Sequence, residues 1–80
     1  MKHELKLLDK YFDDVASGIK SFEIRKNDRN YAVGDVLILR EILSSESRIV
    51  YTGRKIQCEV TYVTNFMQIA DYVVLAIVVI

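Results

Sequence analysis

The last nine residues of the chain, YVVLAIVVI from Tyr72 to Ile80, form its longest apolar run. The run is far shorter than the roughly 20 residues that a helix needs to cross a bilayer. Its many β-branched side chains favour an extended backbone over a helix. Unbroken apolar strands are typical of positions that are buried on both faces of a sheet. The run therefore predicts a central strand and a fold built around a sheet.

The first 18 residues predict a strand followed by one short helix. Residues 2–8, KHELKLL, alternate apolar and polar side chains, which is the period of a half-buried strand. Asp9 offers a side-chain oxygen to the free amides of a helix start, and apolar residues then recur at helical spacing to about Ser17. Gly18 can take the left-handed conformation that ends a helix, so it is first a structural residue.

Short β-rich segments fill the rest of the chain. In residues 20–25, Phe22 and Ile24 point to one side of a strand, while Glu23 and Arg25 point to the other. Three more strands fit residues 36–64, with turns expected at 44–47 and at Thr52-Gly53. A sheet of this size would expose apolar edges unless it curled closed or a helix capped it. We therefore predict an α+β, mainly β fold: a small β-barrel of five to six strands with one short helix, with residues 1–80 forming a single domain.

Composition limits the chemistry that this chain can perform. Eleven basic and eleven acidic residues give no net charge, so no overall field attracts nucleic acid or anionic lipid. The single cysteine and the absence of an apolar leader predict a cytoplasmic protein. No phosphate-binding loop, dinucleotide-binding motif or metal-ligand cluster occurs, so we expect no cofactor and no metal. His3 is expected to be a solvent or strand-edge residue, and Cys58 a buried small apolar one.

Residues 18–29, GIKSFEIRKNDR, are the most informative segment. They hold four cations against two carboxylates, and a second basic segment, which includes Arg54, follows near residue 50. Cations can bind a phosphate, while a carboxylate between them can accept from a base amino group. Tyr31 and Tyr51 are candidate stacking surfaces. The candidate ligand-binding residues are Lys20, Glu23, Arg25, Lys26, Asn27, Asp28, Arg29 and Arg54. The same spacing also fits a solvated ion-pair network of Glu23 and Arg25 without any ligand.

The segment GIKSFEIR matches the pattern G-x-K-x-x-E-x-R and resembles the signature of the ASCH domain family. The later segments YAVGDVLILRE, YTGRKIQCEVTYV and DYVVLAI resemble the family's following strands, so the resemblance covers nearly the whole chain. More narrowly, the chain is similar to a short, single-domain branch found in bacteria and phages. The family is named from activating signal cointegrator proteins, and labels for transcription coactivation or RNA processing follow from that homology.

The resemblance implies a β-barrel of the PUA-like superfamily, whose members bind RNA or modified nucleobases in a cleft beside the helix. By this similarity Lys20, Glu23 and Arg25 lie in the cleft, Gly18 lets the chain turn into it, and residues 26–29 form its rim. Some ASCH proteins look like amidohydrolases that remove an acyl group from the exocyclic nitrogen of cytidine. Lys20 matches the catalytic lysine of those proteins, but Glu23 stands where they have threonine.

Three functions remain open at the level of sequence. The leading hypothesis is a module that binds RNA or another single-stranded nucleic acid, in which Arg29 and Arg54 extend the phosphate contacts of Lys20 and Arg25. The second is a small amidohydrolase that acts on an acylated cytidine or a similar modified nucleoside through Lys20 and Glu23. The third is a non-catalytic interaction module whose apolar last strand or open sheet edge pairs with a partner, for example in a homodimer.

Overall fold

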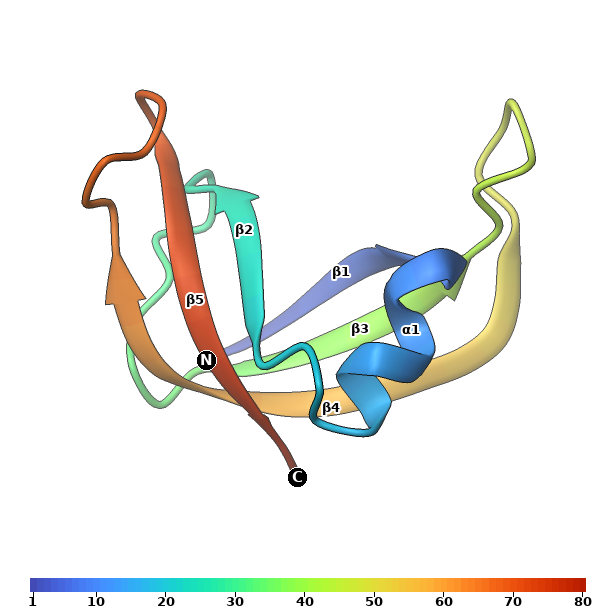
Figure 1. Cartoon of the computed structure of the whole chain (residues 1–80), viewed down its shortest axis with the longest axis horizontal. Helices are drawn as coiled ribbons and strands as arrows, with labels where there is room; N and C mark the ends of the chain where they lie inside the picture. Colours follow the sequence, from blue (N-terminus) through green and yellow to red (C-terminus); the bar gives the residue numbers. More distant parts are fainter.

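The computed structural model describes residues 1–80, which form five strands and one helix (Figure 1). The strands are β1 (Lys2–Leu8), β2 (Phe22–Lys26), β3 (Val36–Ile42), β4 (Tyr51–Thr64) and β5 (Tyr72–Val79), and helix α1 (Asp9–Ala16) follows β1 directly. The alternation in residues 2–8 is borne out, because Leu5 and Leu7 are buried between exposed neighbours. The predicted mainly β fold with one short helix after the first strand is confirmed. No helix is long and apolar enough to cross a membrane.

All five strands belong to one strongly curled sheet with the order β1-β3-β4-β5-β2. Only the β1–β3 pair is parallel, and the connection between these two strands carries α1 and β2. β5 lies between β4 and β2, so the apolar run at the C-terminus occupies an internal position, as predicted. The expected burial on both faces is wrong, because only Val73, Leu75 and Ile77 are buried and the other face is partly open. The sheet is a half-barrel that does not close by strand pairing. Its two edges, β1 and β2, face each other across an opening.

The predicted break at Thr52-Gly53 is wrong. One strand, β4, runs through this position, so residues 36–64 form two strands rather than three. The register between β3 and β4 shifts between Arg40 and Ile42, opposite this part of β4. Gly53 has φ +94°, a conformation that side chains disfavour. The glycine therefore marks a bulge within a strand rather than its beginning.

The two ends of α1 bear out one prediction and correct another. Gly18 has φ +84° and follows the C-cap residue Ser17, as predicted. Asp9 is not the N-cap: Leu8 holds that position, and no side chain caps the helix start. Oδ1 of Asp9 accepts instead from the backbone N–H of Ser44 in the β3–β4 loop. Hydrogen bonding by the side chain and then by the backbone of Ser44 lowers the pKa of this carboxyl. Asp9 therefore ties the helix to a distant loop.

Thirteen apolar residues from every strand except β2, from α1 and from the β2–β3 loop form one core. Cys58 is fully buried within it, as predicted, and burial together with the nearby charge of Glu23 raises the pKa of its thiol to about 11. Of the two positions expected for His3, solvent or a strand edge, the second is confirmed, since His3 lies on the edge strand β1 and is only 4% exposed. Its Nε2 atom lies 2.8 Å from Oδ2 of Asp35, and its ring packs edge-on against Tyr31.

Candidate functional site

Strand β2 turns its charged side toward the interior and its apolar side toward solvent. Glu23 is 3% exposed, while Phe22 and Ile24 are 43% and 54% exposed. The register with β5 explains this orientation, because Glu23 lies opposite Leu75, which is fully buried. Residues that lie opposite each other in an antiparallel pair share a face of the sheet. The pairing of β2 with β5 therefore carries the carboxylate of Glu23 inside.

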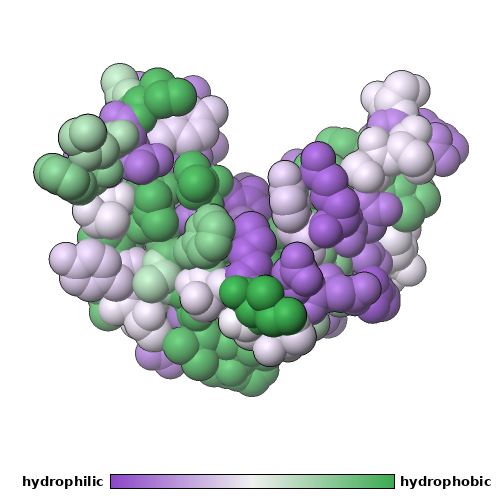
Figure 2. Space-filling view, in the orientation of Figure 1, coloured by the Kyte–Doolittle hydropathy of each residue, from purple (hydrophilic) through white to green (hydrophobic).

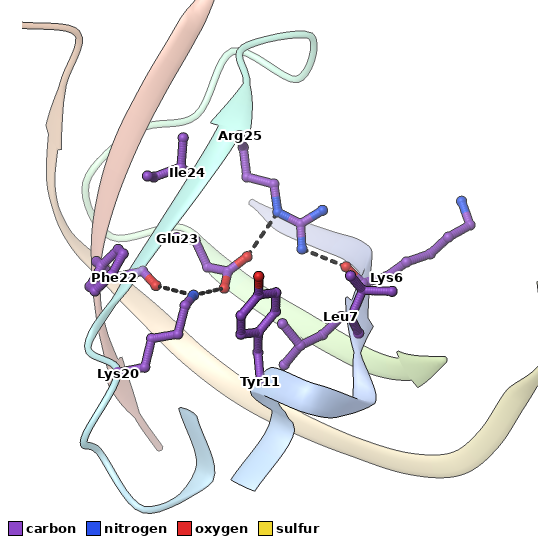
Figure 3. Close-up of a pocket in the computed structure, with 9 residues that line it drawn as sticks. Lys6, Leu7, Tyr11, Lys20, Phe22, Glu23, Ile24 and Arg25 are labelled. Atoms are coloured by element: carbon purple, nitrogen blue, oxygen red, sulfur yellow. Dashed lines mark hydrogen bonds and ion pairs between the residues drawn. The ribbon is translucent and has the colours of Figure 1, made fainter. Parts of the chain in front are cut away.

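Two cations hold the buried carboxylate of Glu23. Nζ of Lys20 donates to Oε1 of Glu23 at 2.8 Å and to the backbone oxygen of Phe22 at 2.8 Å. Nε of Arg25 donates to Oε2 of Glu23 at 2.9 Å, and Nη2 of Arg25 donates to the backbone oxygen of Lys6 (Figure 3). We call Lys20, Glu23 and Arg25 the cleft network. Through Arg25 it bridges the two open edges of the sheet, β2 and β1, and it is buried at Glu23 rather than solvated.

A hollow of about 460 Å³ opens beside the cleft network. Strand β1 contributes Lys6 and Leu7 to its wall, α1 contributes Tyr11, and β2 contributes the residues around Glu23 (Figure 3). Figure 2 shows the surface hollowed between the β4–β5 side, where hydrophobic groups gather, and the α1 side, which is more hydrophilic. A volume of this size lies in the lower part of the range of small-molecule sites.

Two aromatic residues of this hollow, Tyr11 and Phe22, were missed as site residues by sequence reasoning. Tyr11 is 39% exposed, and the centroid of its ring lies 5.4 Å from Nζ of Lys20; the centroid of the Phe22 ring lies 4.7 Å from the same atom. In the sequence Tyr11 looks like a core residue of the helix, next to Phe12. Neighbouring helical positions point about 100° apart, however, so only Phe12 packs into the core. Lys6 was also missed, because the alternation of β1 marks it only as an exposed residue.

The predicted rim residues divide into two groups. Lys26, Asp28 and Arg29 line a smaller hollow of about 220 Å³, and Lys6 and Arg25 contribute to both hollows. Asn27 lies apart from them. Its side-chain oxygen accepts from the backbone N–H of Tyr31, and its own backbone N–H donates to the oxygen of Asp71 in the β4–β5 loop. Asn27 is therefore a turn residue that ties two loops together.

The structure does not bring Arg54 to the cleft. Its Nε and Nη2 atoms donate to both oxygens of the buried Glu41, and its guanidinium also contacts Asp13 and lies over the ring of Phe12. We call Arg54, Glu41, Asp13 and Thr52 the Glu41 cluster; the hydroxyl of Thr52 donates to Glu41 at 2.6 Å. Hydrogen bonds from Arg54 and Thr52 hold the pKa of Glu41 below its usual value. Arg54 therefore lies apart from Lys20 and Arg25 with its guanidinium bound by two carboxylates, and its predicted role in extending their phosphate contacts stays a prediction.

Neither tyrosine that the sequence suggested as a stacking surface lies in this cleft. Tyr31 is buried in the core against His3. Tyr51 carries the guanidinium of Arg40 over its ring, 3.9 Å from the centroid, and lines a different hollow together with Arg54. No group of three or more His, Cys, Asp or Glu side chains is placed to hold a metal ion. The charged groups of the hollow are therefore three cations, Lys6, Lys20 and Arg25, and one carboxylate, Glu23, beside the ring of Tyr11.

Two comparisons place the chain among known proteins. The profile of the family described as "Domain of unknown function (DUF3850)" matches residues 2–77. The chain is also 49% identical over 74 residues to a protein of Escherichia phage P2 described as "Uncharacterized 12.9 kDa protein in GpA 3'region". The aligned part covers 91% of this chain and 64% of the phage protein, so the chain spans just under two thirds of the length of this relative.

Proposed function

The chain belongs to the DUF3850 family, and we propose that it binds single-stranded nucleic acid, with one nucleotide seated in the hollow beside the cleft network. In this proposal Lys20 and Arg25 contact a phosphate or a base carbonyl, and Glu23 accepts from an N–H group of the base. Lys26 and Arg29, in the adjoining hollow, bind the phosphates of neighbouring nucleotides. A cytoplasmic location belongs to the same proposal.

The observation that carries this proposal is a buried carboxylate with two cations at the wall of an open hollow. A buried charge is costly unless it is paired and hydrogen-bonded, so a fold keeps one only where something compensates for it. Lys20 and Arg25 supply that compensation, and together with Lys6 they leave the hollow with more positive than negative charge. A positive hollow with an exposed aromatic ring suits a ligand that carries both a phosphate and a flat base.

The finer family assignment is part of the proposal. The pattern G-x-K-x-x-E-x-R supports placing the chain in the short branch of the ASCH family, within the PUA-like superfamily. The motif residues Lys20, Glu23 and Arg25 meet in one network beside the helix, where the resemblance implies a ligand cleft. Of the substrates that the resemblance implies, RNA fits the open and positively charged hollow.

The contacts of Lys20 favour binding over hydrolysis. An amine that acts as a nucleophile or base needs a free lone pair. Nζ of Lys20 donates to a carboxylate and to a backbone oxygen, which is the arrangement of an ammonium donor. The amidohydrolase is therefore the second reading of this cleft, and turnover of an acylated cytidine is the result that would establish it.

Pairing with another copy is the third reading. The last strand, β5, lies between β4 and β2, and the two ends of the sheet order are β1 and β2, so we expect a partner strand to join β1 or β2. Those two edges flank the hollow, and Arg25 bridges them. A strand added there would cover the cleft, so binding of nucleic acid and pairing at these edges should exclude each other.

Calorimetric titration with a pool of short single-stranded RNAs tests the proposal. We expect binding that weakens as salt is raised, and a loss of about tenfold or more in the variant Lys20→Ala. Lys55→Ala is the matched control, because Lys55 is an exposed lysine on β4 outside this hollow. Equal loss in both variants would show a nonspecific charge effect and overturn the proposal.

The competing functions give different results in the same experiment. Slow heat from acylated cytidine that continues after saturation would mean turnover and would replace binding with hydrolysis. A dimer that persists in Lys20→Ala, with no RNA binding in the wild type, would favour the interaction module.

A further inference from the structure

We propose that the cleft network selects an imide base, uracil or thymine, over the other bases. This inference rests on the proposed function, since it names the base that the same hollow accepts. It follows from the order in which the network presents hydrogen-bond donors and acceptors. That order is set by the positions of Lys20 and Arg25 on opposite sides of Glu23 (Figure 3).

The three side chains keep unused hydrogen-bonding capacity after their mutual contacts. An ammonium has three N–H donors, and Lys20 uses two of them, on Glu23 and on the oxygen of Phe22. A guanidinium has five, and Arg25 uses two, on Glu23 and on the oxygen of Lys6. The carboxylate of Glu23 has about four lone-pair sites, and two accept from the cations. Donors remain at both ends of the network, and acceptor sites remain at its centre.

The order of these groups is donor, acceptor, donor. Lys20 binds one carboxylate oxygen of Glu23, and Arg25 binds the other, so the carboxylate lies between the two cations. A complementary ligand presents an acceptor, a donor and an acceptor along one edge. The imide edge of uracil or thymine has this order, with a ring N–H between two carbonyl oxygens.

The other common bases each fail at one position of this pattern. Guanine places an amino donor beside its ring N–H, so that donor would face a cation. Cytosine offers an amino group with a ring nitrogen on one side but only a C–H on the other. Adenine carries its amino group between two ring-nitrogen acceptors, but these lie on different edges of the base, so no single edge presents an acceptor, a donor and an acceptor. The sequence alone suggested that Glu23 accepts from an exocyclic amino group; the flanking cations instead favour a ring N–H between two carbonyls.

The surroundings of the network suit a flat ring. Tyr11 lies beside the network with its ring partly exposed, and it contributes to the same hollow. Leu7 and Ile24 add apolar wall to that hollow. A pyrimidine could direct its imide edge to the cleft network while its face packs on these groups, which matches the division into polar edge and apolar face of a base.

Competition binding with pentamers of defined sequence tests the inference without any variant. The probes are oligouridine, oligothymidine, oligocytidine, oligoadenosine and a pentamer of 3-methyluridine, in which a methyl group replaces the imide hydrogen. We expect the uridine and thymidine pentamers to bind about tenfold more tightly than the cytidine and adenosine pentamers, as for a well-placed pair of base contacts. The 3-methyluridine pentamer should lose the same factor. A pentamer of deoxyuridine, which differs from oligouridine only in the sugar, distinguishes RNA from DNA as the source of the base.

The variant Glu23→Gln should abolish the preference for uridine, because an amide offers a donor as well as an acceptor between the two cations. Lys55→Ala should leave the preference unchanged. Equal affinity for the uridine and 3-methyluridine pentamers, or tighter binding of cytidine or adenosine, would overturn the imide selection and leave nucleic-acid binding in place. Absence of binding to every pentamer would refute the proposed function itself. If Glu23→Gln does not fold, the 3-methyluridine comparison in the wild type still decides the matter.

Discussion

The cleft network and the Glu41 cluster contain the same types of side chain but differ in their roles. Each holds a buried glutamate against an arginine beside an aromatic ring. In the Glu41 cluster one guanidinium serves two carboxylates, Glu41 and Asp13, and lies over the ring of Phe12. In the cleft network two cations serve one carboxylate and face a hollow. The group with more carboxylates than cations is a brace, by which we mean a set of ion pairs that joins two elements of the fold. The group with more cations than carboxylates keeps hydrogen-bond donors that a ligand can use.

The position of each group in the fold supports this division. Arg54 of β4 joins Glu41 of β3 to Asp13 of α1, so the Glu41 cluster fixes the helix on the sheet. The cleft network lies at the opening between β1 and β2, where strand pairing ends. The two groups should therefore respond oppositely to mutation, one in stability and the other in binding.

The largest effect is expected from Arg54→Ala. This change leaves the buried carboxylate of Glu41 without its cation, and an unpaired buried charge is strongly destabilising. We expect the Tm to fall by an amount on the order of 10 °C, while RNA affinity below the transition changes by about twofold at most. Thermal denaturation followed by circular dichroism, with calorimetry at low temperature, measures both. A tenfold loss of affinity in a folded Arg54→Ala protein would remove the distinction between the two groups.

Arg25→Lys should show the reverse response. Lysine keeps the charge but cannot donate to Glu23 and to the oxygen of Lys6 from one planar group. We expect RNA affinity to fall about five- to tenfold and the Tm to fall by only a few degrees, about half the loss in Arg54→Ala or less. The matched change Arg54→Lys should lower the Tm without affecting affinity. If both lysine variants lose stability and keep affinity, the cleft network is a brace as well.

Acid should destabilise the folded protein in a defined range of pH, through Glu41 of the Glu41 cluster and through Asp35. Hydrogen bonds lower the pKa of Glu41 from its ordinary value of 4.5, and those from His3 and the backbone of Ala32 lower the pKa of Asp35 from 3.8 to about 2. The folded protein thus holds these protons less tightly than the unfolded chain does. The resulting stabilisation is present above the ordinary values and is lost as the pH falls through the lowered ones. Urea unfolding at a series of pH values should show a free energy of unfolding that decreases as the pH is lowered past about 4.5. The decrease should be less steep in Glu41→Gln. An identical slope in that variant would contradict the role of Glu41 in this pH dependence.

The outline of the fold could be read from the sequence, because periodicity reports local geometry. The alternation of residues 2–8, the glycine after the helix and the apolar C-terminal run each depend on one segment alone. The break expected at Gly53 failed because a glycine with positive φ serves a bulge as well as a turn. Only the pairing with the neighbouring strand distinguishes a bulge from a turn at such a glycine.

The candidate site could be predicted only in part, since partner choice is a long-range property. The motif spacing brought Lys20, Glu23 and Arg25 together, because the three lie within six residues of one turn and strand. The same reasoning could not tell that Arg54 faces Glu41 and Asp13, which are 13 and 41 positions away. Nor could it tell that Glu23 points inward, since that depends on its pairing with Leu75.

The rate at which the thiol of Cys58 is labelled gives the test with the smallest expected effects. It depends on the stability that the Glu41 cluster provides and on the charge of Glu23 in the cleft network. Burial, and to a smaller degree the charge of Glu23, raises the pKa of this thiol to about 11, so almost no thiolate is present at neutral pH. Maleimide labelling should therefore be slow and should proceed through opening of the core. Arg54→Ala should accelerate labelling in proportion to its loss of stability. Glu23→Gln should raise the labelling rate only slightly at equal stability, since it removes a charge near Cys58 but leaves the thiol buried. A larger rise in Glu23→Gln than in Arg54→Ala would mean that the cleft network, not the Glu41 cluster, prevents opening of the core.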